Sequence, residues 1–388
     1  MNPDNNCLID EAYDKAVWIL NKCATPHGFF AAHPGYDMVF GRDSMIISLG
    51  ALLLNDGKLN ETVKKSMITL AENQSPRGQI PNAVDKYSKR NHHVDYMSID
   101  SGLWFLIGHY NYMKRFRDGS LLRKYEKNVG LVFDWLAHQD AGEDGMPEQL
   151  PTTDWQDAFP HRYGHTINTQ ALYYHALRLA GKSKEAERLR KVVNENKDFG
   201  LWDAEKGFYV PWRWKNHGKY HEMGEWFDSL GNLLAIIFEL ADKNKAERIL
   251  HYIGGHRIAE PYPIKAIYPA IEKGSKDWQD YFLDCEAGKP WHYLNGGIWT
   301  FVGGFYILAL IKMKKFAEAE RQLQKLAEAN MKNDGNFAEW LNGKTGEIGK
   351  TEAIRLSKNE LGRSYQGWNA AMYIVAYDSL KARRVLIF

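Results

Sequence analysis

Hydrophobic residues along this chain recur with the 3.6-residue period of amphipathic helices, and the connections between these segments alternate in length. The pattern predicts helices at residues 10–23, 42–54, 58–74, 99–116, 121–139, 165–181, 183–196, 227–240, 243–253, 297–314, 316–332 and 365–382. Five turns that leave even-numbered helices are short, whereas the segments that enter them run to tens of residues. Because short turns fold neighbouring helices back antiparallel, the long loops should share one end. We therefore predict an all-α fold, an (α/α)6 barrel of six inner and six outer helices with a loop-lined funnel.

The predicted inner and outer helices differ in the distribution of their apolar residues. Residues 44–54 and 297–311 are apolar on almost every side, which indicates burial all round and an inner position. Residues 316–332 have one apolar stripe and a Lys/Glu face, which is typical of an outer helix half in water. Short β-hairpins are expected in the long loops, for instance at 207–214. No linker separates the helices, so we expect residues 1–388 to form a single domain.

Composition narrows the class of protein. The chain has 44% hydrophobic and 25% charged residues, a balance typical of soluble globular proteins. A formal net charge of +2, with acids and bases mixed, gives no basic stripe for nucleic acid. No apolar run approaches the ~20 residues of a membrane span. The three cysteines lack metal-binding spacing and the polar start lacks a signal-peptide core, so we expect a cytoplasmic protein that needs no cofactor or metal.

Charged residues stand at the mouths of the first two predicted inner helices. Arg42 and Asp43 follow Tyr36 in the first long loop and could clamp neighbouring sugar hydroxyls, although a capping Asp beside an Arg explains them equally well. Asp100 falls in a very apolar first turn, where an unneeded carboxylate would be costly, which favours a ligand role. Trp104, one turn later, fits either the core or a platform for a sugar ring.

The third long loop is the richest in candidate chemistry. It holds Asp154, Trp155, Asp157, His161 and Arg162, and Gln170 follows in the next helix. A carboxyl held against aromatic surface has its charged form disfavoured and its pKa raised, which suits a general acid at neutral pH. From the residues alone, Asp154 and Asp157 are both candidates for this acid.

A second candidate carboxylate, Glu339, lies between Phe337 and Trp340 in the last long loop. Further aromatic and amide side chains at the mouths of inner helices are candidate sugar contacts: Trp226, Trp291, Asn295, Trp299, Gln366 and Trp368. Of these, Trp299 is ambiguous between the core and a sugar platform. Two carboxylates far apart in sequence, with Trp, Tyr and Gln between them, suit glycoside hydrolysis, in which an acid protonates the leaving oxygen and a base activates water.

Several motifs in chain order resemble those of a known clan. They are Phe40-Gly41-Arg42-Asp43, Ile80-Pro81-Asn82, Ser98-Ile99-Asp100, Asn295-Gly296-Gly297-Ile298-Trp299 and Tyr365-Gln366-Gly367-Trp368. The chain resembles the (α/α)6-barrel glycoside hydrolases, and within them the alkaline/neutral invertases and the amylo-α-1,6-glucosidase domain of glycogen debranching enzymes. The first motif looks like the debranching enzymes, whereas the last two look more like the invertases.

The resemblance implies roles for the two carboxylates. Asp157 falls at the position of the general acid in both branches, and Glu339 at the position of the general base. Asp154 then ranks second, as a ligand of a sugar hydroxyl. The chain departs from the invertases directly after the acid, where Ala158 and Phe159 replace a pair of arginines.

We expect an inverting, exo-acting glycoside hydrolase that cleaves an α-glucosidic bond in a small saccharide, such as sucrose or an α-1,6-glucoside. One alternative is a sugar 2-epimerase or isomerase on a similar barrel, which needs two histidines in one cavity. Here that would require His161 or His165 with a distant partner such as His251 or His292. A second alternative is a non-catalytic barrel that binds sugar. In every case the expected partner is a small saccharide, with no nucleic acid and no membrane.

Overall fold

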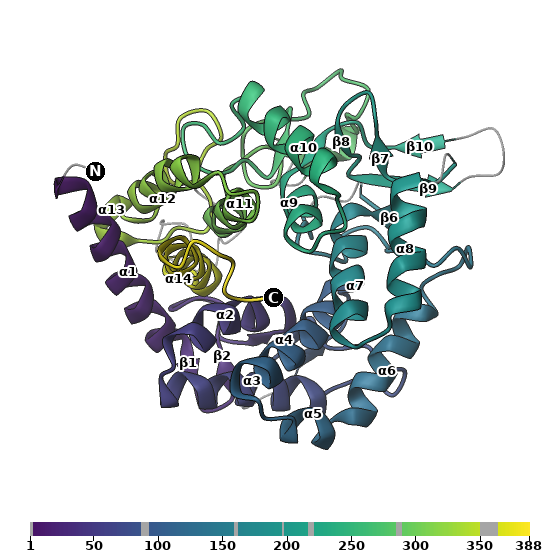
Figure 1. Ribbon diagram of the computed structural model, residues 1–388, viewed down its shortest axis with the longest axis horizontal. Coiled ribbons are helices and arrows are strands. Elements are labelled where there is room, and N and C mark those ends of the chain that lie inside the picture. The colour runs from purple at the N-terminus through teal and green to yellow at the C-terminus, as the bar shows by residue number, and fades with distance from the viewer. Residues whose placement is uncertain are drawn as a thin grey trace.

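The computed structural model describes residues 3–86, 93–158, 162–195, 198–215, 221–284, 289–349 and 364–388. The chain is mainly helical (Figure 1). Its α-helices are α1 (Pro3–Cys23), α2 (Gly41–Leu54), α3 (Gly57–Glu72), α4 (Asp100–Phe116), α5 (Ser120–Lys124), α6 (Glu126–Ala137), α7 (Ile167–Leu179), α8 (Ser183–Glu195), α9 (Ser229–Ile237), α10 (Lys243–Gly255), α11 (Thr300–Lys312), α12 (Phe316–Asn330), α13 (Lys332–Gly335) and α14 (Gly367–Lys381), with a 3-10 helix at Asp280–Asp284.

Two concentric rings of helices make up the described part of the chain. The inner ring is α2, α4, α7, α9, α11 and α14, each packed on the next, and α14 contacts both α11 and α2, which closes the circle (Figure 1). The outer helices α1, α3, α6, α8, α10 and α12 pack on α14, α2, α4, α7, α9 and α11 respectively. The predicted (α/α)6 barrel is confirmed.

Burial follows the pattern of the sequence. Every residue of α11 from Thr300 to Ile311 is buried, whereas α8 buries only Ala186, Leu189 and Val193. Inner helices also approach each other closely at glycines. A Cβ placed on Gly304 would lie 2.7 Å from the Cβ of Met372, so α11 and α14 can pack at this distance only with glycine there. This close contact offsets the roughly 1 kcal/mol that a glycine costs inside a helix relative to alanine.

Two local predictions are wrong. The helix expected at 121–139 is interrupted at Tyr125, whose backbone (φ −109°, ψ 23°) leaves the helical region between α5 and α6 while its side chain packs into the core near His109. Residues 207–214 do not form one hairpin, because β8 pairs with β7 while β9 pairs with β10 and β6. In both cases partners elsewhere in the chain override a local pattern.

Short strands join the long loops to one another. They are β1 (Ala24–Thr25), β2 (Gly28–Phe29), β3 (Val39–Phe40), β4 (Ala83–Val84), β5 (Val94–Asp95), β6 (His165–Thr166), β7 (Trp202–Asp203), β8 (Phe208–Tyr209), β9 (Trp212–Lys215), β10 (His221–Met223), β11 (Phe227–Asp228) and β12 (Ile267–Tyr268). All the pairings are antiparallel, in sheets of order β1-β2, β3-β4-β5, β7-β8, β10-β9-β6 and β11-β12.

Three of these strands lead directly into inner helices: β3 into α2, β6 into α7 and β11 into α9. The sheets therefore hold the long loops against the N-termini of the inner helices. At a helix N-terminus the first N–H groups have no partner within the helix and the helix dipole favours negative charge. Asp43 and Asp100 lie in the first turns of α2 and α4, where this effect favours a carboxylate.

The last residues of the chain cover the opposite end of the barrel. The Phe388 ring lies 5.6 Å from that of His175, 5.0 Å from that of Phe238 and 6.4 Å from that of Phe305, and Lys114 Nζ donates to its carbonyl oxygen at 2.7 Å. The C-terminus accordingly lies near the centre of the ring (Figure 1). Among the described residues, no helix combines the length and the apolar character that crossing a bilayer would take.

Candidate active site

Arg42, in the first turn of α2, joins three of the long loops. Its Nη1 donates to Asp100 Oδ1 at 3.1 Å, its Nη2 donates to Asp157 Oδ2 at 3.3 Å, and its Nε lies 3.7 Å from Asp43 Oδ2. The guanidinium is almost completely buried. Arg42 therefore fixes the positions of protein carboxylates, and through them the loops that carry these groups.

Asp100 begins α4 and is completely buried. Burial raises the pKa of its carboxyl, and the charge of Arg42 opposes this rise. Ser98 Oγ also donates to Asp100 Oδ1 at 2.7 Å. These donors compensate the burial of the carboxylate and account for an acid in such an apolar turn.

Asp157 is the carboxylate of this group that faces open space, since 49% of its side chain is accessible. Protein atoms nevertheless crowd around the carboxyl and remove much of its hydration. This desolvation raises the pKa of Asp157 to about 6; Arg42 opposes the rise, and the negative charges of Asp43 and Asp100 add to it. A carboxyl with this pKa keeps a protonated fraction close to neutral pH, as a general acid requires.

Glu339 lies in the loop after α13 and is 4% exposed. The hydroxyl of Tyr36 donates to Glu339 Oε1 at 2.9 Å, and the Tyr36 ring packs edge-on against Phe40. Tyr36 and Arg42 belong to one segment, residues 36–42. That single segment therefore contacts both predicted catalytic carboxylates, Glu339 through Tyr36 and Asp157 through Arg42.

A second buried arginine, Arg162, stabilises the third long loop. Its Nη2 lies 3.1 Å from Asp154 Oδ2 and 3.0 Å from Asp228 Oδ2, with all three side chains buried. Asp154 Oδ1 also accepts from the backbone N–H of Gln156 at 3.0 Å. Asp154 is thus engaged within the protein, in the loop that carries Asp157.

Aromatic rings from the third loop, α11 and α14 pack together at the mouths of these helices. Trp155 is edge-on to Trp299 and Phe301, and Trp368 stacks on Phe301 at 4.2 Å between ring centroids. Within the described residues, three buried donors of this group have no hydrogen-bond partner: Trp155 Nε1, Gln366 Nε2 and Trp368 Nε1. Buried donors normally have partners, so these groups fit a site for ligand hydroxyls or water.

Two predicted contacts are instead occupied within the protein. Asn295 uses its Oδ1 to accept from the N–H of Ile271 at 2.7 Å and its Nδ2 to donate to the carbonyl of the same residue at 2.9 Å. Gln170 Nε2 donates to the Pro147 carbonyl at 2.8 Å. Asn295 therefore has both amide atoms bonded within the protein, whereas the buried Gln170 Oε1 has no partner among the described residues.

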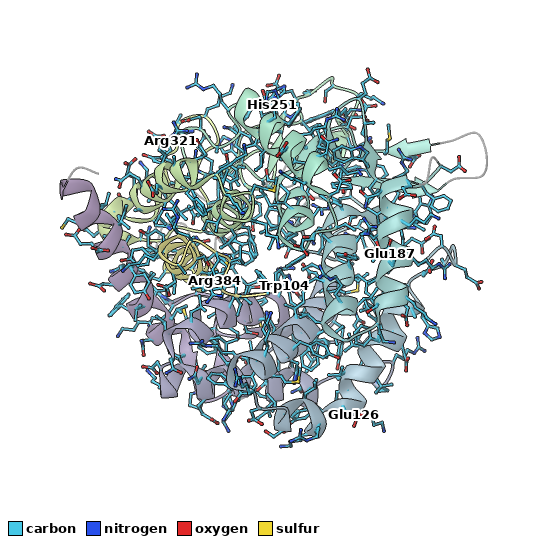
Figure 2. The ribbon with its side chains drawn as sticks, viewed as in Figure 1. Trp104, Glu126, Glu187, His251, Arg321 and Arg384 are labelled. Atoms are coloured by element: carbon cyan, nitrogen blue, oxygen red, sulfur yellow. The ribbon has the colours of Figure 1, made fainter. Side chains whose placement is uncertain are left out.

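Four predicted tryptophans differ in their surroundings. Trp104 is 1% exposed and packs against Phe305, near the centre of the ring (Figure 2). Trp226 is also buried. Trp299 is buried and its Nε1 donates to the Tyr293 carbonyl at 3.0 Å. Trp291 is half-buried, with Lys344 Nζ 5.2 Å from its ring centroid. We place Trp104 and Trp226 in the core.

Asp228 and Gln156 were not among the predicted site residues. Asp228 is completely buried beside Arg162, and burial raises its pKa to about 6. The sequence does carry a signal for Asp228, an acid at the start of an apolar helix, which is the pattern that singled out Asp100. Gln156 is also buried and neither of its amide atoms has a partner among the described residues. The predicted contact His161 lies outside the described residues.

The described histidines that an epimerase was expected to use, His165, His251 and His292, lie in different parts of the barrel. His165 is buried, with Nε2 3.7 Å from Asp144 Oδ2 and 3.5 Å from Glu148 Oε1. His251 lies at the outer edge of the barrel on α10 (Figure 2), and His292 is beside Trp340. No group of three or more His, Cys, Asp or Glu side chains among the described residues is arranged to hold a metal ion.

The sequence is similar to those of known invertases. Residues 216–382 match the family model for alkaline and neutral invertases. Rice (Oryza sativa subsp. japonica) neutral/alkaline invertase 1, a mitochondrial protein, is 26% identical over 328 residues, which are 71% of this chain and 50% of that protein. Cytosolic invertase 1 of rice is 32% identical over 332 residues, 72% of this chain and 56% of that protein. The chain thus spans about half the length of these curated invertases.

Solved structures show the same architecture. The GH63 mannosylglycerate hydrolase of Thermus thermophilus, in complex with Tris and D-glycerate, superposes with a TM-score of 0.70 at 16% identity, covering 95% of this chain and 100% of that one. A glycosidase variant in complex with glucose superposes with a TM-score of 0.66 at 15% identity, covering 98% of this chain and 99% of that one. The chain has the fold of the (α/α)6-barrel glycoside hydrolase clan and is similar in sequence to its invertase branch.

Proposed function

We propose that the chain is a glycoside hydrolase in which Asp157 is the general acid and Glu339 the general base. The observation that carries this proposal is the contact of one short segment with both groups, through Arg42 to Asp157 and through Tyr36 to Glu339. In an inverting hydrolase an acid protonates the leaving oxygen while a base removes a proton from water on the opposite face of the sugar. Two carboxylates on different loops of one funnel suit this division of work.

The surroundings of the two carboxylates support these separate roles. The Asp157 side chain is half exposed, and its raised pKa, about 6, favours the protonated form that donates to the leaving oxygen. Glu339 is buried and accepts a hydrogen bond from Tyr36, which stabilises a carboxylate and orients it toward a water molecule. After one turnover Asp157 is left deprotonated and Glu339 protonated, and exchange with solvent restores both.

The aromatic group at the mouths of the inner helices supports exo action on a terminal ring. Trp155, Trp368 and Phe301 fill the mouths of inner helices, and Phe388 covers the far end of the barrel, so a saccharide would enter end first. The free donors of Trp368 and Gln366 would then bond the hydroxyls of that ring. We propose a small α-glucoside as substrate, with sucrose first because of the similarity to invertases, and an α-1,6-glucoside second.

The test is a reducing-sugar assay on sucrose, isomaltose and trehalose, with proton NMR of the first product formed. An inverting enzyme acting on an α-glucoside releases β-glucose. Asp157→Asn and Glu339→Gln should each lower kcat by ~10²–10⁴-fold. Asp37→Asn and Glu347→Gln, matched changes at exposed acids of the first and last long loops, should stay within about twofold of wild type. Turnover of both site variants within a few-fold of wild type would refute the assignment.

The alternatives make different predictions. An epimerase would convert free monosaccharides. Among the described residues, His165 lies beside Asp144 and Glu148, whereas His251 is on the outer helix α10. A sugar-binding protein would be stabilised thermally by a disaccharide that it never cleaves. Incubation with mannose, glucose and fructose, followed by sugar analysis, distinguishes the first alternative, and the assay above distinguishes the second.

A further inference from the structure

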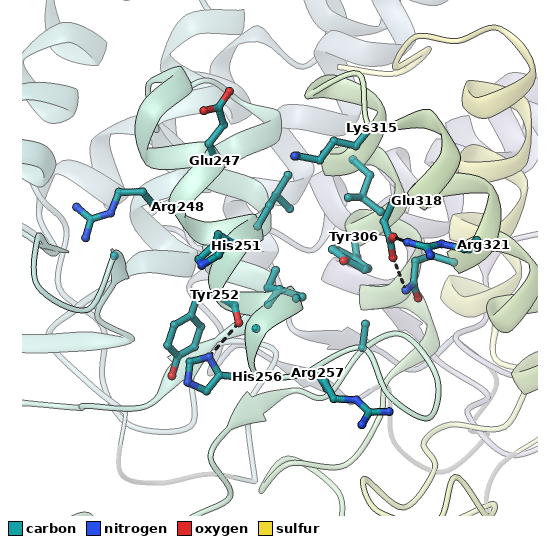
Figure 3. Close-up of a pocket in the computed structure, with 18 of the residues that line it drawn as sticks. Glu247, Arg248, His251, Tyr252, His256, Arg257, Tyr306, Lys315, Glu318 and Arg321 are labelled. Atoms are coloured by element: carbon teal, nitrogen blue, oxygen red, sulfur yellow. Dashed lines mark hydrogen bonds and ion pairs between the residues drawn. The ribbon is translucent and has the colours of Figure 1, made fainter.

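A large groove lies on the outside of the barrel, away from the proposed active site. It lies between the outer helices α10 and α12 (Figure 3), and Tyr306 and Leu310 of α11 also line it. Its volume is about 1430 Å³. None of the predicted site residues lines it. Pockets for small molecules usually measure roughly 300–1,000 Å³, so this groove suits a larger occupant.

Two glycines in the wall of the groove have no explanation within the chain. Gly254 and Gly255 form the last turn of α10, and a Cβ on either would meet nothing within 4 Å. The left-handed position that glycine favours after a helix is taken by Arg257, at φ 52°. By contrast, Gly303 and Gly304 of α11 are required by contacts with neighbouring backbone. Paired helical glycines beside open space fit the close approach of an outside helix, because small residues let two backbones come near.

The groove carries positive charge. Seven Lys or Arg side chains line it against four Glu, an excess of three, whereas the formal net charge of the whole chain is +2. Arg321 is paired with Glu318, and Arg248 donates to the Ala204 carbonyl at 2.5 Å. Within the described residues, Arg257, Lys314 and Lys315 have no carboxylate within ion-pairing distance, and all three are exposed. Figure 3 labels Arg257 and Lys315.

We propose that the groove between α10 and α12 is a docking site for an acidic, amphipathic helix of a partner protein. Two helical walls with apolar side chains in the lining between them match helix-in-groove recognition. The 13 residues of α10 span about 20 Å, the length of a helix of about four turns. The unpaired cations on the rim select acidic flanks, and the four interspersed Glu side chains disfavour a uniformly charged nucleic-acid backbone.

The experiment uses the full chain and a display library of 15-residue peptides on a helical framework, varied on both faces. Selected peptides should be rich in Asp and Glu beside apolar residues spaced three and four apart. Their affinity is measured by fluorescence anisotropy against wild type, an Arg257→Glu/Lys315→Glu variant and a Gly255→Leu variant. We expect each variant to weaken binding at least ~10-fold, the first by removing complementary charge and the second by filling the groove. Raising the salt concentration should weaken binding to wild type as well.

The matched control is Lys184→Glu/Lys191→Glu, which reverses two exposed charges on the outer helix α8. It should leave affinity within about twofold of wild type. Circular dichroism and thermal melting check that every variant is folded, and none touches the proposed active site. The proposal is overturned if the selected peptides are not acidic or bind the groove variants as tightly as wild type. It is also overturned if an oligonucleotide competes at equal charge, or if sedimentation shows self-association that the groove variants abolish.

Discussion

The hydroxyl of Tyr36 donates a 2.9 Å hydrogen bond to the carboxylate of Glu339, across 303 positions of sequence. Six residues after Tyr36, Arg42 donates to Asp157. The first long loop thus sets the positions of both proposed catalytic groups, although it contributes neither of them. Its conformation in turn depends on β3, which pairs with β4 of the second long loop.

Tyr36→Phe is expected to lower kcat by ~10–100-fold with little change in KM, because a hydrogen bond to a charged group contributes about 1.5–3 kcal/mol. The ring and its contact with Phe40 remain, so the fold should be unaffected. Steady-state kinetics on the substrate found by the disaccharide assay make the measurement. Tyr96→Phe, which removes a hydroxyl bonded to the Asn73 carbonyl, is the control and should leave kcat unchanged. Equal losses in both variants would contradict a positioning role for Tyr36.

The dependence of activity on pH should report Asp157. Its pKa is raised to about 6, and as general acid it must be protonated, so kcat/KM should fall as the pH rises through this value. The negative charge of Asp43 contributes to that raised pKa. Asp43→Asn should therefore move the alkaline limb of the profile to lower pH, whatever its effect on the maximum rate. Asp37→Asn, at an exposed acid of the same loop, serves as the control. If the alkaline limb of the Asp43→Asn variant stays in place or moves to higher pH, Asp157 is not the group that the profile reports.

Asp228 should make stability depend on pH. Burial raises its pKa from 3.8 to about 6, so the folded state binds its proton more tightly than the unfolded state does. The stabilisation is complete below the unfolded pKa, near ~3.9, and is lost as the pH rises through about 6. Between pH 4 and 6 the loss amounts to at most about 3 kcal/mol. The Asp228→Asn variant has no such carboxyl and does not lose this stabilisation. In urea unfolding, the difference in stability by which the variant falls below wild type should therefore shrink as the pH rises over this range. A difference that grows would contradict the raised pKa of Asp228.

Glycines of inner and outer helices should respond oppositely to alanine. Gly304→Ala places a Cβ 2.7 Å from Met372 and should destabilise the chain by about 1–3 kcal/mol or more. Gly254→Ala meets nothing within 4 Å and should stabilise the chain by up to about 1 kcal/mol through helix propensity. Thermal or urea unfolding of the two variants gives both values. A loss of stability in Gly254→Ala would mean that an unseen contact of the chain itself requires that glycine.

The barrel could be predicted from the sequence, while much of the site could not. Periodicity placed the helices, and the alternation of short and long connections placed the loops at one end, because both depend on neighbours in sequence. The chemical candidates at Arg42, Asp100, Asp157 and Glu339 do lie on that end of the barrel. Their partners were not predictable. Asp100 and Arg42 belong to separate segments of the chain, and the pairing of Asp154 with Arg162 depends on side-chain rotamers that the sequence pattern does not specify.

Residue type alone also did not determine what several side chains contact. Asn295 and Trp104 have the chemistry of sugar contacts, yet the first bonds the backbone of Ile271 and the second packs in the core. The sequence by itself determined the helices, which of them are buried all round, and where the chemistry gathers, because local hydrophobic pattern and chain length control these features. Only the tertiary structure decided which carboxylate stays open, which amide is already bonded, and that α10 and α12 leave a groove between them. Those outcomes depend on distances between segments far apart in the chain, which packing alone determines.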